Sequence, residues 1–248
     1  MSISVEGLRR TYGDLTAVQY LSFKVSPGEI VGLIGPNGAG KTTTLRALAG
    51  ILRPTAGRVL IGGFDIVEQP LDARRQLAFM PDEPHLFEYL TVEEHLRLIG
   101  RLYGVADVDA RAQPLLEELE LVGKQQALPG ELSRGMKQKV VIACGLVRNP
   151  PVLLFDEPLT GLDPIGIRRM RDTIVRRARN GAAVLLSSHM LPLVQEVCTR
   201  VVIMYRGRKF ADGTVQELAE RVELHQADST LEEIFLRITG HDAPAGEA

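Results

Sequence analysis

A glycine-rich octapeptide between an apolar run and a helix-like run constrains the fold of this chain more than any other feature. The apolar run is 30–34, the octapeptide 35–42 reads Gly-Pro-Asn-Gly-Ala-Gly-Lys-Thr, and the helix-like run continues to residue 49. Glycine lets backbone N–H groups approach phosphate oxygens closely, and the helix N-terminus that follows adds partial positive charge. A strand, a glycine loop and a helix in this order predict a phosphate-binding loop in an α/β fold.

The residue types in this loop predict specific roles at a nucleotide. Lys41 is expected to reach the β- and γ-phosphates, and the hydroxyl of Thr42 is expected to bind Mg²⁺. The other candidate nucleotide contacts in the loop and the first helical turn are Gly35, Pro36, Asn37, Gly38, Ala39, Gly40 and Thr43. A glycine-rich turn between a strand and a helix can also be purely structural, so the motif needs support from the rest of the chain.

An acidic pair follows a second apolar run, 152–155, later in the chain. Carboxylates at the end of a buried strand are unfavourable unless they bind an ion or act on water. Asp156 is therefore a candidate ligand for Mg²⁺, and Glu157 is a candidate general base for a water that attacks the γ-phosphate. The alternative is that the pair only caps a helix, and the phosphate loop upstream favours the first interpretation.

The segment between these motifs carries a resemblance to a known family. It reads Leu-Ser-Arg-Gly-Met over 132–136 and leads into a long helix-like run. It resembles the Leu-Ser-Gly-Gly-Gln signature of the ATP-binding-cassette (ABC) family, with departures at Arg134 and Met136. The resemblance implies that Ser133 and Gly135, which are kept, lie against ATP. Two interpretations stay open for Arg134: contact with the phosphates of the ATP held by a partner chain, or exposure to solvent.

Three further positions match the family in order, and the resemblance covers nearly the whole chain, from 3 to about 240. Asp163, in Thr-Gly-Leu-Asp, resembles the acidic residue of the D-loop, which lies near ATP. His189 follows an apolar run and resembles the switch histidine, which contacts the γ-phosphate. Tyr12 stands where the family stacks an aromatic ring on adenine. Without the resemblance, His189 would be read as a structural residue and Tyr12 as a core or surface tyrosine.

One position departs from the family in its charge. The family has a glutamine after the strand that here reads Leu-Ala-Phe-Met-Pro over 77–81, and this chain has Asp82 instead. The amide oxygen of that glutamine approaches Mg²⁺, so the resemblance makes Asp82 a candidate metal ligand, and a carboxylate is a good ligand for a hard cation. The alternative is a solvated acidic turn.

The sequence pattern predicts an α/β fold with a P-loop NTPase core around a parallel sheet. Alternation of apolar and polar residues over 21–26 indicates a half-buried strand in an N-terminal antiparallel β lobe. A capping box at 91–94 begins a helical pattern, so we expect an inserted α-helical lobe over about 87–149. We expect a single domain over 1–240 and a polar tail over 241–248.

Composition limits the classes of partner that are expected for this chain. The net charge is −2, which marks no surface for a polyanion, so no nucleic-acid partner is expected. No apolar run approaches roughly 18 residues, and the start of the chain lacks the pattern of a secretion signal. The resemblance implies ATP and Mg²⁺ as cofactors, a second ABC ATPase chain facing the first head to tail, and an integral membrane permease. It places the chain on the cytoplasmic face of the cell membrane through that permease.

The favoured function is the ATP-binding and ATP-hydrolysing subunit of an ABC transporter. The segments 80–84 and 231–235 are most similar to ATPases of ABC-2-type exporters. One alternative is a non-transport ABC ATPase in DNA repair or translation, and the lack of a sustained heptad run and of a second cassette weighs against it. Another is a regulatory module that binds nucleotide without turnover, and Glu157 and His189 weigh against that.

Overall fold

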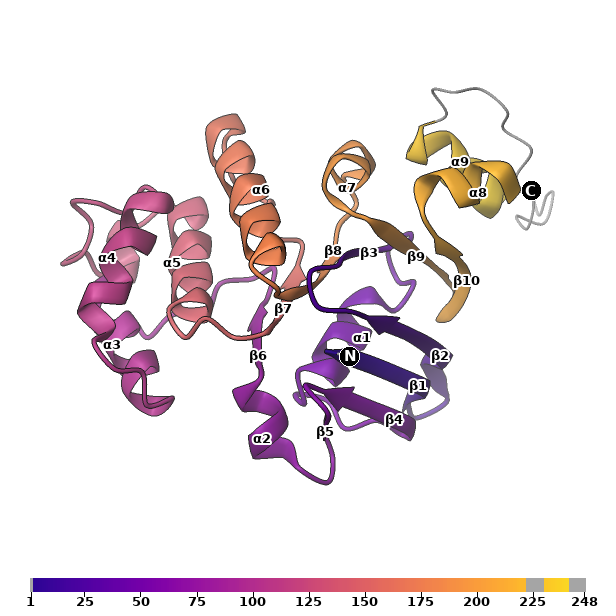
Figure 1. Ribbon diagram of the computed structural model, residues 1–248, viewed down its shortest axis with the longest axis horizontal. Helices are drawn as coiled ribbons and strands as arrows, with labels where there is room; N and C mark the ends of the chain where they lie inside the picture. Colours follow the sequence, from indigo (N-terminus) through magenta and orange to yellow (C-terminus); the bar gives the residue numbers. More distant parts are fainter. Residues whose placement is uncertain (1, 222–229, 241–248) are drawn as a thin grey trace.

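The computed structural model describes residues 2–221 and 230–240, and the predicted polar tail lies outside them. Within this part, a six-stranded sheet with the order β10-β9-β3-β8-β7-β6 forms the centre of the molecule (Figure 1). Its strands are β3 (Ile30–Ile34), β6 (Leu77–Met80), β7 (Val152–Asp156), β8 (Ala183–Ser187), β9 (Arg200–Tyr205) and β10 (Arg208–Gly213). Strands β6, β7, β8, β3 and β9 pair in parallel, and β10 pairs antiparallel with β9.

The three strands at the centre of this sheet are buried along their whole length. Every residue of β3, β7 and β8 is buried, as expected for parallel strands that are covered on both faces. Each is followed by a helix: α1 (Lys41–Leu48), α6 (Pro164–Arg179) and α7 (Leu191–Val197), respectively. The predicted α/β core with a parallel sheet is therefore confirmed, and the carboxyl ends of these strands share one edge of the sheet.

The predicted N-terminal antiparallel lobe is also confirmed. A second sheet has the order β2-β1-β4-β5 and is built from β1 (Ile3–Tyr12), β2 (Leu15–Val25), β4 (Ala56–Ile61) and β5 (Phe64–Asp65). Glycine is required at Gly57 in β4, because its φ is +87° and a Cβ there would lie 2.2 Å from the carbonyl oxygen of Gly7. Helix α2 (Pro70–Arg75) joins this lobe to β6.

Helices follow β6 and precede β7, within the range predicted for the helical lobe. They are α3 (Val92–Leu102), α4 (Val108–Glu118), the short 3₁₀ helix η1 (Pro129–Glu131) and α5 (Arg134–Leu146). The predicted capping box is present at the start of α3, where Thr91 Oγ1 accepts from Glu94 N and Glu94 Oε2 accepts from Thr91 N. Figure 1 shows α3, α4 and α5 together at one end of the molecule, with α8 (Val215–Arg221) and α9 (Leu231–Gly240) at the other.

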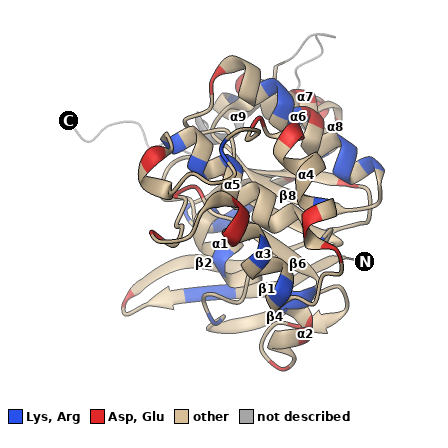
Figure 2. Cartoon of the chain, turned by 90° about the vertical axis from the view of Figure 1, so that its left-hand side faces the viewer, with Lys and Arg blue, Asp and Glu red and all other residues tan. Residues whose placement is uncertain are grey.

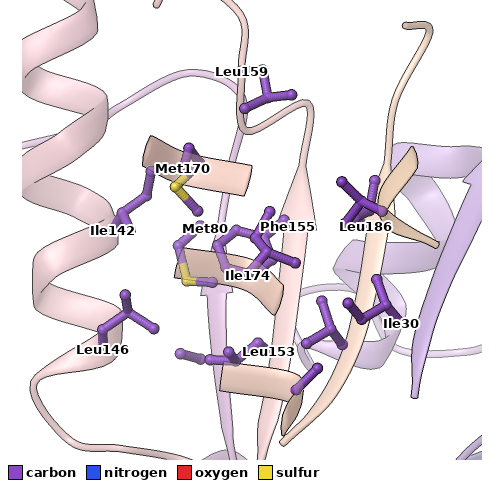
Figure 3. Packing of buried hydrophobic residues seen from close by; sticks show 14 of the residues in the cluster. Ile30, Met80, Ile142, Leu146, Leu153, Phe155, Leu159, Met170, Ile174 and Leu186 are labelled. Carbon is purple, nitrogen blue, oxygen red and sulfur yellow. The ribbon is translucent and has the colours of Figure 1, made fainter. Parts of the chain in front are cut away.

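Two hydrophobic clusters lie on the two faces of the central sheet. On one face, Ile142 and Leu146 point from α5 toward Met80 of β6 and Phe155 of β7 (Figure 3), all of them buried. On the other face, the neighbouring residue Leu154 packs in the cluster that includes α1 and the antiparallel lobe. Because successive side chains of a strand alternate between faces, β7 is held from both sides and its acidic end has a fixed position.

Candidate functional site

The phosphate loop connects β3 to α1 at the carboxyl edge of the central sheet. Gly40 has a φ of +100°, and a Cβ there would lie 2.5 Å from the carbonyl oxygen of Ala17 in β2. Residues 36–38 are exposed, and α1 has no acidic residue in its first turn. The loop therefore leaves the helix N-terminus open toward an anion, as a phosphate site requires.

Lys41 is folded back onto its own loop. Its side chain is buried, and Nζ donates to Gly35 O at 2.7 Å and to Pro36 O at 3.2 Å. Burial lowers the pKa of Lys41, while the nearby charges of Glu157 and Asp156 act in the opposite direction. A phosphate oxygen is a stronger partner for an ammonium group than a neutral carbonyl, so a triphosphate can compete for Nζ.

Asp156 ends β7 and is joined to two hydroxyl groups. Its Oδ1 accepts from Ser187 Oγ at 2.6 Å and from Thr42 Oγ1 at 3.2 Å, and the residue is 2% exposed. Ser187 ends β8 and pairs directly with Asp156 in the sheet. Ser187 is not among the predicted site residues, although its hydroxyl group at the end of a neighbouring strand is a signal that the sequence offers.

This donor set fits Mg²⁺. Thr42 and Asp156 offer a hydroxyl oxygen and a carboxylate oxygen within reach of one another, and Mg²⁺ is held in nucleotide sites by one or two such groups together with phosphates and water. Among the described residues, no three His, Cys, Asp or Glu side chains form a cluster that could hold a metal alone. A metal here would therefore depend on oxygen atoms from the nucleotide.

Glu157 and His189 form a second pair beside this network. Glu157 Oε2 lies 2.8 Å from His189 Nδ1 and accepts from His189 N at 3.3 Å. The backbone of Glu157 has a φ of +48°, which is unusual for a residue with a side chain, and its N–H donates to Ser187. The conformation turns the Glu157 side chain, which is 16% exposed, toward His189, which is 63% exposed.

The other predicted nucleotide contacts lie apart from this network. Ser133 caps α5 by accepting from Met136 N at 3.3 Å, and Asp163 caps α6 by accepting from Gly166 N at 2.9 Å. A Cβ at Gly135 would lie 2.7 Å from Gly161 O in the loop before α6. No hydrogen bond within the described residues joins Ser133, Gly135 or Asp163 to the phosphate loop of the same chain.

Tyr12 lies at the end of β1, in the hairpin that contacts the phosphate loop through Ala17. The tyrosine is 42% exposed, and Arg10 Cζ lies 4.5 Å from the centre of its ring. Arg10 is itself held by Arg53, whose carbonyl oxygen accepts from Nη1 at 2.9 Å. The ring therefore has one face against a guanidinium and an exposed part on which a base can stack.

Two charged residues that depart from the family pattern, Arg134 in the signature and Asp82 after β6, contact one another. Arg134 Nη2 lies 3.4 Å from Asp82 Oδ1, a contact that neither interpretation of Arg134 from the sequence included. Asp82 also lines a cavity of about 720 Å³ together with Thr42 and Asp156. The structure thus places Asp82 between the candidate metal site of its own chain and the start of α5.

The fold and the phosphate loop define a P-loop ATPase domain, and comparison with known proteins identifies its family. Residues 18–160 match the family described as ABC transporter, and the chain belongs to that family. It is 36% identical to the ABC-type transporter ATP-binding protein EcsA of Bacillus subtilis, over 97% of this chain and 98% of the relative. It is 38% identical to the doxorubicin resistance ATP-binding protein DrrA of Mycobacterium tuberculosis, over 96% of this chain and 71% of the relative.

Solved structures agree with this assignment. The ATP-binding subunit of an ABC transporter superposes with a TM-score of 0.92 at 36% identity, covering 96% of this chain and 100% of the other. A dimeric ATP-binding cassette bound to ADP and Pi has a TM-score of 0.79 at 25% identity, covering 86% and 98%. The chain is therefore the ATP-binding subunit of an ABC transporter, and the alternatives in DNA repair and translation are not favoured.

Proposed function

We propose that this chain hydrolyses Mg²⁺-bound ATP to drive a separate integral membrane permease of the ABC-2 exporter type. The observation that carries the proposal is the meeting of Lys41, Thr42, Asp156 and Glu157 at one edge of the sheet, with Thr42 and Asp156 hydrogen-bonded. The relatives support the direction of transport, since one is a doxorubicin resistance protein and another, 41% identical over 88% of this chain and 72% of the relative, is the Nod factor export ATP-binding protein I of Burkholderia thailandensis.

Each of these residues has a step in the proposed reaction. Lys41 exchanges the carbonyl oxygens of Gly35 and Pro36 for phosphate oxygens when ATP enters. Thr42 and Asp156 would hold Mg²⁺, which when bound supplies positive charge to the β- and γ-phosphates. Glu157 accepts a proton from water as the water attacks the γ-phosphorus, the bond from that phosphorus to the bridging oxygen breaks, and ADP leaves. His189 orients the Glu157 carboxylate, and we infer that it also contacts the γ-phosphate.

We further propose that two chains face each other and complete two ATP sites. Ser133, Gly135 and Asp163 then contact the nucleotide that is bound by the partner chain. In support, the start of α5 has no acidic side chain in its first turn, and the similar ADP- and Pi-bound cassette is dimeric. Tyr12 stacks on the adenine of the ATP bound by its own chain. Residues 1–240 act as one domain in this arrangement.

The permease is proposed to dock on the loop after β6, at the cytoplasmic face of the cell membrane. Phe87 and Tyr89 in this loop are 61% and 88% exposed. His95, buried in α3, holds the loop, because its Nε2 accepts from Phe87 N at 2.9 Å while Nδ1 lies 2.7 Å from Thr91 O. Positive and negative side chains are mixed on this side of the molecule (Figure 2), so an apolar contact fits better than a strongly charged one. None of the described helices is long and apolar enough to cross a bilayer.

Co-purification from detergent-solubilised membranes tests the permease. We expect the unsubstituted chain to bring down a multi-span membrane protein and Tyr89→Ser to reduce its recovery. Tyr20→Ser is the matched control, because Tyr20 is also exposed, at 69%, but lies in the antiparallel lobe. Equal loss with both variants, or no membrane protein with any of them, would contradict the proposal.

A further inference from the structure

The first two turns of α5 hold the loop after β6 through two side chains. Arg134 Nη2 lies 3.4 Å from Asp82 Oδ1, and Gln138 Nε2 donates to Pro81 O at 2.9 Å. Residues separated by four positions in a helix lie on the same face, so Arg134 and Gln138 form one surface. This surface contacts two consecutive residues of the loop.

The two contacts differ in their environment. Gln138 is 1% exposed, and its Oε1 is buried without a hydrogen-bond donor among the described residues. The side chains of Arg134 and Asp82 are 57% and 45% exposed. Exposed ion pairs are weak and exchange readily. A buried hydrogen bond from a side-chain amide is costly to break, because it leaves a buried polar group without a partner. Gln138 is therefore the fixed contact and Arg134–Asp82 the exchangeable one.

The exchangeable pair connects the surroundings of two different nucleotides. Asp82 lines the cavity that also contains Thr42 and Asp156, which belong to the site of its own chain. Arg134 follows Ser133 at the start of α5, the segment proposed to face the nucleotide of the partner chain. A cation at a helix N-terminus is unfavourable without a nearby anion, and in the free chain Asp82 provides that anion.

We propose that Asp82 and Arg134 form an exchangeable ion pair that couples the two nucleotide sites of a dimer. In the free chain they neutralise each other. In the ATP-bound dimer, Asp82 turns toward the metal side of its own site and Arg134 turns toward the phosphates held by the partner chain. Gln138 is a positioning residue that keeps the loop attached to α5 during the exchange. The inference rests on the proposed function, because the second site exists only in a head-to-tail pair.

A double-mutant cycle on dimer formation tests the exchange. The variants are Asp82→Asn, Arg134→Gln and the two together, each measured by sedimentation with Mg²⁺ and a slowly hydrolysed ATP analogue. Each single substitution removes one contact from the dimer. It also removes the ion pair that stabilises the free chain and opposes dimer formation, which partly offsets the loss. The double substitution removes both dimer contacts but gains this offset only once. The double variant should therefore dimerise about 2- to 5-fold per site more weakly than the product of the single effects, which is the range of an exposed ion pair.

Glu83→Gln with Lys137→Gln is the matched control cycle, since these residues lie on the same loop and helix and, in the described part of the chain, form no ion pair with each other. The effects of Glu83→Gln and Lys137→Gln on the dimerisation constant should multiply. Simple multiplication for 82 and 134 as well, or a deviation in the opposite direction, would overturn the coupling while leaving the proposed function intact. A chain that binds the analogue but never dimerises would instead overturn both.

The positioning role of Gln138 has a separate readout. Gln138→Leu should increase the rate of amide hydrogen exchange across 82–85 in the free chain, because the loop loses its buried contact. The circular dichroism spectrum should stay unchanged, which separates loss of the contact from loss of the fold. Unchanged exchange in a folded variant would contradict the positioning role.

Discussion

Residues from distant parts of the sequence meet at one edge of the central sheet. Thr42 and Ser187 both donate to Asp156 Oδ1, at 3.2 and 2.6 Å, so a single buried carboxylate links the phosphate loop to the end of β8. Lys41 is buried beside them, and its hydrogen-bond partners among the described residues are two neutral carbonyl oxygens. Within this part of the chain the cation has no anionic hydrogen-bond partner, and in the proposed function a triphosphate supplies one.

Lys41→Ala should weaken ATP binding itself. The variant loses a charge-assisted hydrogen bond to phosphate, of about 1.5–3 kcal/mol, which corresponds to roughly a 10- to 150-fold rise in Kd. Fluorescent-nucleotide titration gives the Kd directly. Lys209→Ala is the control, because Lys209 pairs with Asp212 on β10 and should leave the Kd unchanged. Equal affinity of Lys41→Ala and the unsubstituted chain would exclude a phosphate contact for Lys41.

Asp82→Ala should lower turnover and raise the Mg²⁺ concentration required for the half-maximal rate. We expect a change of about 10-fold, the scale on which groups around a metal alter its affinity. The measurement is an ATPase rate over a Mg²⁺ titration at fixed ATP. Asp72→Ala, which removes a surface carboxylate paired with Arg75, is the control. An unchanged titration would leave only the solvated-turn interpretation of Asp82.

Among the elements, the site depends on the parallel strands β3, β8 and β7, whose carboxyl ends lie next to one another in that order. Lys41, Asp156 and Glu157 could be located from the sequence because each follows an apolar run, and the carboxyl ends of parallel strands meet. The contact between Arg134 and Asp82 could not, because the residues are 52 positions apart and their approach depends on how α5 packs against β6. The role of Ser187 likewise requires the register that pairs it with Asp156.

Helix α3 depends on its capping box, which lies directly after the proposed docking loop. Thr91→Ala removes the side chain that accepts from Glu94 N, and we expect the free energy of unfolding to fall by about 0.5–2 kcal/mol. Urea denaturation measures the change, with the same dependence of the unfolding free energy on urea concentration used for both proteins. Thr55→Ala is a useful comparison, because Thr55 is exposed and caps no helix, although its hydroxyl accepts from Thr11 N. A Thr91→Ala variant as stable as the unsubstituted chain would mean that packing alone holds α3.

In the whole molecule, the candidate nucleotide site and the helical lobe lie at different parts of the central sheet. The phosphate loop and the acidic strand ends lie at its carboxyl edge, while the helices α3, α4 and α5 form a lobe beside β6 (Figure 1). Asp82 lies in the loop that joins the two regions and contacts Arg134 at the start of α5. In the proposed coupling, a change at the nucleotide reaches the helical lobe through this loop.

If Glu157 is the general base for ATP hydrolysis, its replacement by glutamine should abolish most of the steady-state ATPase rate. The amide keeps the shape of the carboxylate but cannot accept the proton, and loss of a general base lowers turnover about 10²- to 10⁴-fold. We expect that loss in Glu157→Gln, with ATP binding retained and a long-lived ATP-bound dimer, while Glu68→Gln, on the exposed loop before α2, keeps the full rate. Turnover by Glu157→Gln within a few-fold of the unsubstituted chain would exclude Glu157 as the general base.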